Sequence, residues 1–517
     1  MKEKLLSLGL VCAAVGGGME VLMKKVIVIG AGIAGMAAGI YALQSGFDVT
    51  ILEQHTIPGG NCTSWKRGGY LFEGGMHWLT GSDRKQPVNR LWREIGALTT
   101  DTKVHLRDPF VTYDYNGQYI CLYRDLNNLR EHLCAISPQD TDNIKRLCKD
   151  VKAFSAISMP IMDIPGVKIK STEKGPSMLG MLPKLLPVLS RMKTYSKLSV
   201  KQYVKQFKHP AIRLLLSHVV GEEYDVTALM FTLACLASGD GGYVEGGSLR
   251  MATNIAKHFK KLGGTIAYSS KVERIIIDNN RATGVLVDGV RHDADAVIVS
   301  SDTLTAVDQL FDQPVHEPWT DKMRANTKPA NCTFICLGVE ADLTHLPEAI
   351  IYTLNNPIDF AGNKIDTLSI NNYATYEGYS PKGCSSLTLI LDGCYDYWKN
   401  AAKDNSYVQK KQELAKKIIT QLEEKIPIIK NKVSIWDVAT PLTYERYCGT
   451  YQGSWMTVTT PGSQRVTYPS KPTGMDNLYL AGQRLQPPGG LPVALHTGRQ
   501  AVQHLCKDNQ IVFQNRI

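Results

Sequence analysis

The chain has 517 residues, a size at which one hydrophobic core stops growing, so two domains are expected. A composition of 44% hydrophobic and 21% charged residues excludes wholesale disorder, and the formal charge of +10 comes without a recognition fold that would favour nucleic acid. Twelve cysteines without paired metal-ligand spacing predict a reducing, cytoplasmic location and no metal site.

The first 22 residues are expected to lie outside the fold. Two lysines precede the apolar run from Leu5 to Val15, as in a short signal peptide. This run is too short to span a bilayer, no twin-arginine pair is present, and the first predicted strand of the fold follows at once. The codons for residues 19–21 can instead resemble a bacterial ribosome-binding site. We therefore expect translation to start at Met23, which makes residues 1–22 a mis-assigned start, with a leader as the alternative.

Residues 24–54 are typical of a buried strand, a glycine turn, an alanine-rich helix and a second strand. The GxGxxG pattern in the turn would permit a tight turn, a close approach of pyrophosphate, and packing of the helix on the strand. Glu53 ends the second strand at the spacing expected for a ligand of an unphosphorylated adenosine ribose. The alternative is a glycine turn of another α/β protein. The predicted dinucleotide ligands here are Gly30, Gly32, Ile33, Ala34, Gly35, Glu53 and Gln54.

A second glycine-rich segment runs from Pro58 to His77 and has no counterpart in a simple nicotinamide dehydrogenase. Its glycine pairs would let the chain wrap a diphosphate and a ribityl chain without Cβ clashes, although a glycine-rich surface loop is the alternative. The segment favours FAD over NAD. It adds Gly60 and Asn61 to the predicted cofactor ligands.

The segments 97–230 and 311–469 lack nucleotide motifs, so we expect them to form an interleaved α+β substrate domain over the flavin. Strands are predicted at residues 333–337 and 386–391. Residues 163–208 hold ten lysines and arginines against two acidic residues, interspersed with apolar pairs. This pattern suits peripheral contact with an anionic inner membrane face, through which a lipid substrate would enter. A solvated helical surface is the alternative interpretation.

The last fifty residues are predicted to close the nucleotide fold. Residues 477–505 indicate a strand, a glycine turn, a proline-rich loop and a helix that starts at Leu491 or Pro492. The positive end of this helix suits the flavin pyrimidine edge, where negative charge accumulates on reduction. Residues 23–96, 231–310 and 470–517 are therefore assigned to a Rossmann-like FAD-binding domain, in which helices flank a parallel sheet.

These segments together resemble the phytoene desaturase, carotenoid isomerase and retinol saturase family of FAD proteins over nearly the whole chain from Met23. The resemblance implies that the strand at Val272 contacts the adenine side. Gln483 stands where many relatives have an acidic residue, and its amide is still able to bind ribityl hydroxyls. Residues 72–77 are similar to a saturase motif, which favours reductase chemistry. The residues implied at the flavin are Gly482, Gln483, Gly490, Leu491 and Val493.

Flavin chemistry needs a hydride route and a group that handles protons. His77 is the first candidate, because the ordinary pKa of imidazole lies near neutrality; a structural histidine beside the flavin is the alternative. Glu73 is the second candidate. Tyr444 is the third, within a stretch that resembles the family's TPLT element, and it is expected to face the flavin ring together with Tyr447, with packing as its alternative role.

The leading hypothesis is an FAD-dependent oxidoreductase that saturates, desaturates or isomerises carbon–carbon double bonds of a polyene, retinoid or related lipid. No second GxGxxG unit is present, so electrons would be exchanged with a quinone, with transiently bound NAD(P)H, or with the substrate itself. The second hypothesis is an amine-oxidase-like flavoenzyme, which needs an aromatic cage. A non-catalytic lipid-escort protein is the third, and the complete glycine set with Glu53 argues against it.

Overall fold

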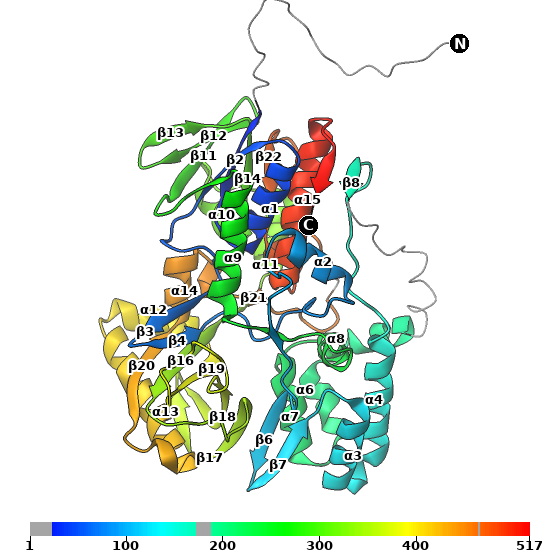
Figure 1. Ribbon diagram of the computed structural model, residues 1–517, viewed down its shortest axis with the longest axis vertical. Coiled ribbons are helices and arrows are strands. Elements are labelled where there is room, and N and C mark those ends of the chain that lie inside the picture. The colour runs from blue at the N-terminus through cyan, green and yellow to red at the C-terminus, as the bar shows by residue number, and fades with distance from the viewer. Residues whose placement is uncertain (1–22, 172–187, 464–465, 517) are drawn as a thin grey trace, which may run out of the picture.

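The computed structural model describes residues 23–171, 188–463 and 466–516 (Figure 1). The expectations for residues 1–22, and for the apolar pairs between Met178 and Leu186, lie outside the described residues. A five-stranded sheet with its helices occupies one end of the molecule, and a seven-stranded sheet and a group of helices occupy the other (Figure 1). Within the described part of the chain, no helix combines the length and the apolar character needed to cross a bilayer.

The five-stranded sheet is parallel, as expected for the predicted Rossmann-like fold. Its strand order is β10-β2-β1-β14-β22, and every neighbouring pair runs parallel. The first strand, KVIVI, buries four of its five residues, which is typical of a strand covered on both faces. Distant parts of the chain supply the strands β1 (Lys25–Ile29), β2 (Asp48–Leu52), β10 (Thr265–Ala267), β14 (Ala296–Val299) and β22 (Leu478–Leu480).

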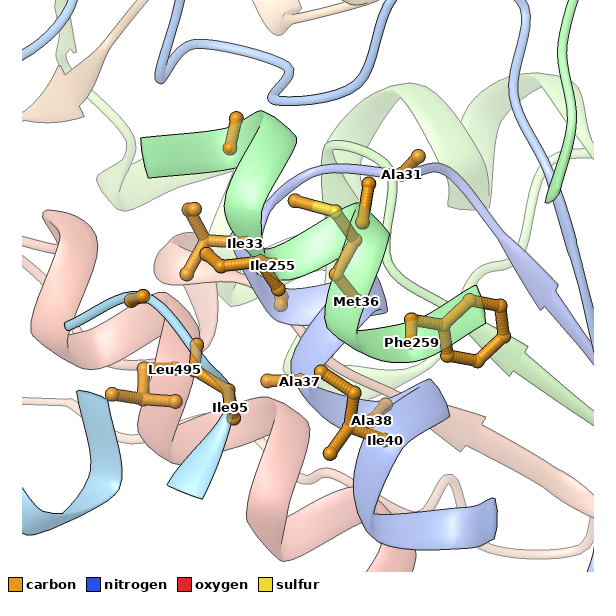
Figure 2. Close-up of a cluster of buried hydrophobic side chains, with 14 of the residues drawn as sticks. Ala31, Ile33, Met36, Ala37, Ala38, Ile40, Ile95, Ile255, Phe259 and Leu495 are labelled. Atoms are coloured by element: carbon orange, nitrogen blue, oxygen red, sulfur yellow. The ribbon is translucent and has the colours of Figure 1, made fainter. Parts of the chain in front are cut away.

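Three helices pack together beside this sheet. Figure 2 shows Ala37 of the first helix in one apolar cluster with Ile255 of the second and Leu495 of the third. The first and third helices approach closely, because a Cβ atom on Gly498 would lie only 2.3 Å from the backbone oxygen of Ala34. The helices are α1 (Ile33–Gln44), α9 (Gly247–Lys261) and α15 (Leu491–Asp508). Against β14 packs the antiparallel sheet of β11 (Val272–Asp278), β12 (Arg281–Val287) and β13 (Val290–Asp293).

The second large sheet has seven strands in the order β20-β16-β19-β18-β17-β6-β7, and only its β17–β6 pair is parallel. The two strands predicted at residues 333–337 and 386–391 are confirmed, and they pair with each other from Thr333 opposite Leu391 to Leu337 opposite Leu387. The strands are β6 (Val111–Tyr115), β7 (Gln118–Leu122), β16 (Cys332–Val339), β17 (Ala349–Phe360), β18 (Asn363–Asn372), β19 (Ser385–Asp392) and β20 (Val433–Ala439).

A group of helices flanks β6 and β7 and shares one apolar cluster with them. It contains α3 (Leu126–Ile136), α4 (Thr141–Phe154), α6 (Val200–Tyr203), α7 (Pro210–Val220) and α8 (Val226–Ala237). Helix α8 crosses the domain boundary predicted at residue 230 and packs against α4, while the division into domains stays a prediction. Further α-helices of the described residues are α2 (Pro87–Glu94), α10 (Thr303–Gln309), α11 (Pro318–Asn326), α12 (Tyr395–Lys403), α13 (Tyr407–Lys425) and α14 (Pro441–Cys448).

Short strand pairs join these parts. Strands β3 and β4 form a hairpin within the glycine-rich 58–77 segment. Strand β4 contacts β16 and β19 of the larger sheet. This hairpin therefore links the end that holds the five-stranded sheet to the end that holds the seven-stranded sheet. The short strands are β3 (Ser64–Arg67), β4 (Tyr70–Glu73), β5 (Val104–His105), β8 (Ile169–Ser171), β9 (Tyr243–Val244), β15 (Pro329–Ala330), β21 (Met456–Thr457) and β23 (Phe513–Asn515).

Candidate functional site

The turn between β1 and α1 has the tight geometry that its glycines predict. Gly30 adopts φ +99°, a left-handed conformation that favours glycine. A Cβ atom on Gly35 would lie 2.0 Å from the oxygen of Gly30 and 2.3 Å from Oγ of Ser300, so only glycine fits there. The N-cap residue of α1 is Gly32, which has no side chain with which to cap the first turn. Its backbone N–H groups are therefore available to a phosphate, and the helix dipole favours the negative charge.

Glu53 is buried directly after β2, on the wall of the same cavity. One carboxylate oxygen accepts a hydrogen bond of 2.6 Å from the backbone N–H of Ala31, and the other accepts one of 2.7 Å from that of His55. Burial raises the pKa of Glu53, while these backbone donors act in the opposite direction. The carboxylate is thus held in place with acceptor capacity left for hydroxyl groups.

A cavity of about 1230 Å³ opens beside this turn, larger than the ~300–1,000 Å³ of ordinary small-molecule sites. The structure brings almost all predicted cofactor residues to its wall. Gly35 is the exception, because it lies behind the turn in the helix–strand contact. Their roles in binding remain predictions. The lining residues among them are Gly30, Gly32, Ile33, Ala34, Glu53, Gln54, Gly60, Asn61, Val272, Gly482, Gln483, Gly490, Leu491 and Val493.

The C-terminal turn reaches the cavity at the start of α15, which begins at Leu491 as predicted. Gly482 and Gly490 have φ values of +139° and +94°, and no side chain caps the helix. The side-chain oxygen of Gln483 accepts a hydrogen bond of 2.8 Å from the backbone N–H of Gly490. Gln483, which departs from the family pattern, therefore stabilises this turn. The N-terminal end of α15 lies at the cavity.

His77 lies on the cavity wall, enclosed by aromatic side chains. Its ring stacks on Phe334 with the centroids 6.2 Å apart, and it meets Trp455 edge-on at 5.6 Å. Burial lowers the pKa of His77 to about 4, and the positive charge of Arg107 and the electrostatic interaction with His218 act in the same direction. The pKa of His77 thus lies below the ordinary value of imidazole, because the enclosed site disfavours the imidazolium. At neutral pH the ring is uncharged.

The other two predicted catalytic side chains lie behind the cavity wall. The carboxylate of Glu73 accepts hydrogen bonds from the backbone N–H groups of Gly75 (2.9 Å) and Met76 (3.1 Å), and from the hydroxyl of Tyr243 (2.6 Å). The hydroxyl of Tyr444 donates to the backbone oxygen of Gly74 at 2.6 Å. Both side chains brace the loop that carries His77.

Tyr447 was expected to face the flavin ring beside Tyr444, and the structure places neither on the cavity wall. Tyr447 is 45% exposed and meets the ring of His55 edge-on. Tyr444 is buried on α14 and reaches the 74–77 loop, whereas Tyr447 in the last turn of the same helix lies at the protein surface.

Sequence reasoning missed a buried ion pair at the carboxyl end of β14. Asp302 lines the cavity and forms a two-pronged salt bridge with Arg484, and both side chains are almost fully buried. Arg484 also donates to Oγ of Ser454 at 2.8 Å. The pair ties the end of β14 to the C-terminal turn. Its sequence signal was the polar run Ser300-Ser301-Asp302 directly after a buried strand, where ligands of such sheets gather.

The chain is 24% identical over 510 residues to a lycopene-forming phytoene desaturase of Pseudescherichia vulneris, with 94% of this chain and 100% of that protein covered. It is 24% identical over 507 residues to the chloroplastic prolycopene isomerase of Daucus carota, with 93% of this chain and 80% of that protein covered. A crystal structure of an oxidoreductase from Methanosarcina mazei has the same fold, with a TM-score of 0.58 at 17% identity and coverage of 92% and 98%.

The residues around the cavity fit a flavin dinucleotide. Two uncapped helix N-termini and a buried carboxylate face one space, and glycines stand where a Cβ atom would crowd the turn. These are the groups that phosphates, a flavin edge and ribose hydroxyls require. The model of the flavin containing amine oxidoreductase family matches residues 33–506, nearly the whole length. The chain belongs to the flavin containing amine oxidoreductase family.

Proposed function

We propose that this protein is an FAD-dependent oxidoreductase that acts on carbon–carbon double bonds of a polyene, retinoid or related lipid. The observation that carries the proposal is that one cavity joins the dinucleotide turn to a wall of apolar and aromatic side chains. Phe110, Phe231 and Phe334 belong to that wall, as do Trp78 and Trp455. Relatives named for phytoene desaturation and prolycopene isomerisation support a substrate of this chemistry.

Bound FAD would supply hydride transfer to or from a substrate carbon. The chain's own part is to hold it. In our proposal the start of α1 faces the diphosphate, Glu53 accepts from the adenosine ribose, and the start of α15 faces the pyrimidine edge, where its partial positive charge favours the reduced state. Electrons would be exchanged with a quinone or transiently bound NAD(P)H, and an isomerisation would need no external partner.

His77 is the proposed proton-handling group, and its environment restricts how it works. The ring is neutral at neutral pH and lies between Phe334 and Trp455 on the cavity wall. A neutral imidazole accepts a proton at one nitrogen and donates at the other, so His77 can hold a proton that leaves or joins a substrate carbon. Glu73 and Tyr444 would position His77 through the loop that they brace.

Peripheral membrane contact through residues 163–208 remains part of the proposal. Leu189, a described residue of this segment, is 52% exposed. Met162, the residue directly before the segment begins, is 49% exposed. Exposed apolar side chains within a basic segment favour a surface of anionic lipid, from which an apolar substrate would enter. Vesicle flotation with and without phosphatidylglycerol tests this contact.

The decisive experiment follows the flavin under anaerobic conditions. The purified holoprotein is reduced with dithionite and offered retinol, lycopene, phytoene and linoleic acid separately, and the oxidised protein is offered the same lipids. We expect one polyene to change the flavin spectrum and to emerge with an altered number or geometry of double bonds. If every lipid is recovered unchanged while benzylamine or putrescine bleaches the oxidised flavin, the amine-oxidase alternative replaces the proposal. Failure to retain flavin on purification would support a lipid-escort role.

A further inference from the structure

Arg107 is a buried cation on the wall of the cavity, and part of its guanidinium has no partner. Its side chain is 5% exposed, and it lines the cavity together with residues of α7 and β18. Nε donates to the hydroxyl of Tyr376 at 2.9 Å, and Nη1 donates to Oδ1 of Asn371 at 2.8 Å. Nη2 is buried and has no hydrogen-bond partner among the described residues. A buried charged donor without an acceptor is costly and calls for an explanation.

The surroundings of Arg107 favour its charged form without satisfying Nη2. The rings of Tyr243, Tyr373 and Tyr376 lie 5.4–5.5 Å from the guanidinium carbon, close enough for cation–π attraction. A carboxylate oxygen of Glu348 is 3.7 Å from Nε, and Glu348 also accepts from Tyr376 and Thr375. The hydrogen-bond acceptors therefore lie at the Nε and Nη1 edge, and the buried Nη2 is left without one within the described part of the chain.

Further polar groups continue from Arg107 along the cavity wall. Asn371 and Ser369 stand two residues apart on β18, so both point to the same face of the sheet. Oγ of Ser369 lies 2.9 Å from Nε2 of His218. His218 lines the cavity, and its side chain is accessible there. Val219, Val220 and Ala349 line the cavity beside them. Arg107, Asn371, Ser369 and His218, here called the polar pole, thus form a hydrogen-bonding patch within an apolar wall.

We infer that the polar pole binds an oxygen-bearing end of the substrate, and that the preferred substrate is a polyene with a terminal carboxylate. A carboxylate matches a guanidinium in charge and in its paired acceptor geometry, and it would supply the acceptor that Nη2 lacks. The polyene part of this inference rests on the proposed function. With one end held at Arg107, the length of the chain fixes which double bond reaches the flavin.

The test compares one polyene with and without its charge. Retinoic acid, its methyl ester and retinol are titrated into the oxidised holoprotein, and the quenching of tryptophan fluorescence gives the dissociation constants. Trp78 and Trp455 line the cavity and report on binding. We expect retinoic acid to bind at least about tenfold more tightly than its methyl ester, the usual scale of a charge-assisted pair. Equal binding of the acid and the ester overturns the inference without any variant.

Substitutions then assign the preference to Arg107. Arg107→Gln should weaken retinoic acid binding about tenfold or more and leave the ester unchanged, whereas Arg107→Lys, which keeps the charge without the fork, should lose less. Arg146→Gln, at an exposed arginine on α4, is the matched control and should change neither ligand. Flavin content and melting temperature show whether each variant folds. If Arg107→Gln does not fold, Asn371→Ala must reduce the preference for the acid, or the inference fails.

The result separates this inference from the proposed function. An acid preference that depends on Arg107, in a protein whose flavin responds to no polyene, would leave the binding site standing and remove the proposed reaction. Turnover of polyenes with equal affinity for acid, ester and alcohol would support the proposed reaction and overturn the inference about the carboxylate. A preference for the acid that persists in Arg107→Gln would place the carboxylate elsewhere and overturn the inference.

Discussion

In our proposal the cavity has a cofactor side and a substrate side, and the two sides are built from different atoms. On the cofactor side, the groups that face the cavity are largely backbone N–H groups at the starts of α1 and α15, exposed by glycines and left without capping side chains. On the substrate side, side chains from β16, β18, α7, α8 and the 74–78 loop form the wall. The cofactor side therefore depends on local backbone conformation. The substrate side depends on which distant segments of the chain pack together.

This difference predicts that single substitutions reduce stability and flavin binding most strongly on the cofactor side, where an added Cβ atom would clash with the backbone. Gly35→Ala places its methyl group 2.0 Å from a backbone oxygen, so we expect a loss of about 1–3 kcal/mol in the free energy of unfolding and no retained flavin. Denaturant unfolding and the flavin absorbance of the purified variant measure the two effects.

Gly32→Ala is the matched control, because its Cβ atom would find its nearest neighbour at 4.0 Å. This variant should fold with wild-type stability and still lose flavin affinity, since its methyl group would stand where the diphosphate approaches. Wild-type stability in Gly35→Ala, or full flavin retention in Gly32→Ala, would contradict the role assigned to the turn.

Glu53 is the side chain on the cofactor side whose loss is expected to weaken FAD binding. Glu53→Gln removes the charge and should weaken FAD binding about tenfold, near 1.4 kcal/mol. Burial raises the pKa of Glu53, so the carboxylate gains its proton at a higher pH than an ordinary glutamate. FAD affinity should therefore fall as the pH decreases through that raised pKa, and this dependence should disappear in the variant. Flavin fluorescence on dialysis at stepped pH measures it.

The same difference explains what the sequence was able to predict. Gly30, Gly35 and Glu53 follow one another in a single βαβ unit, and local spacing determines their geometry, so the cofactor turn and the start of α15 were predictable. Arg107 carried no local signal in the sequence. Its hydrogen-bond partner Asn371 belongs to β18, which lies more than two hundred residues later in the chain. The exposure of Tyr447 and the depressed pKa of His77 likewise depend on tertiary packing, which no residue pattern encodes.

On the substrate side, enclosure of His77 predicts a loss of stability in acid. The pKa of His77 in the folded protein is about 4, against about 6.5 for an ordinary histidine. The unfolded chain therefore binds a proton as the pH falls below 6.5 while the folded protein does not, so stability falls progressively between pH 6.5 and 4. His77→Leu should reduce this loss by roughly 2 kcal/mol, measured by thermal unfolding at pH 7 and pH 4.5. His292→Leu, at an exposed histidine of β13, should leave the acid sensitivity unchanged.

The smallest effect is expected at Tyr444, which lies behind the cavity wall and braces the loop that carries His77. Tyr444→Phe removes only the hydrogen bond to the backbone oxygen of Gly74, so the free energy of unfolding should fall by about 1 kcal/mol. If Tyr444 only positions the loop, the variant keeps the pH profile of turnover and loses rate modestly, because His77 is displaced rather than replaced. A changed pH profile, or a loss of rate beyond a hundredfold with intact flavin binding, would make Tyr444 a direct participant. The ring of Phe334, 5.6 Å from that of Tyr444, stacks on His77 and offers the path for such a displacement.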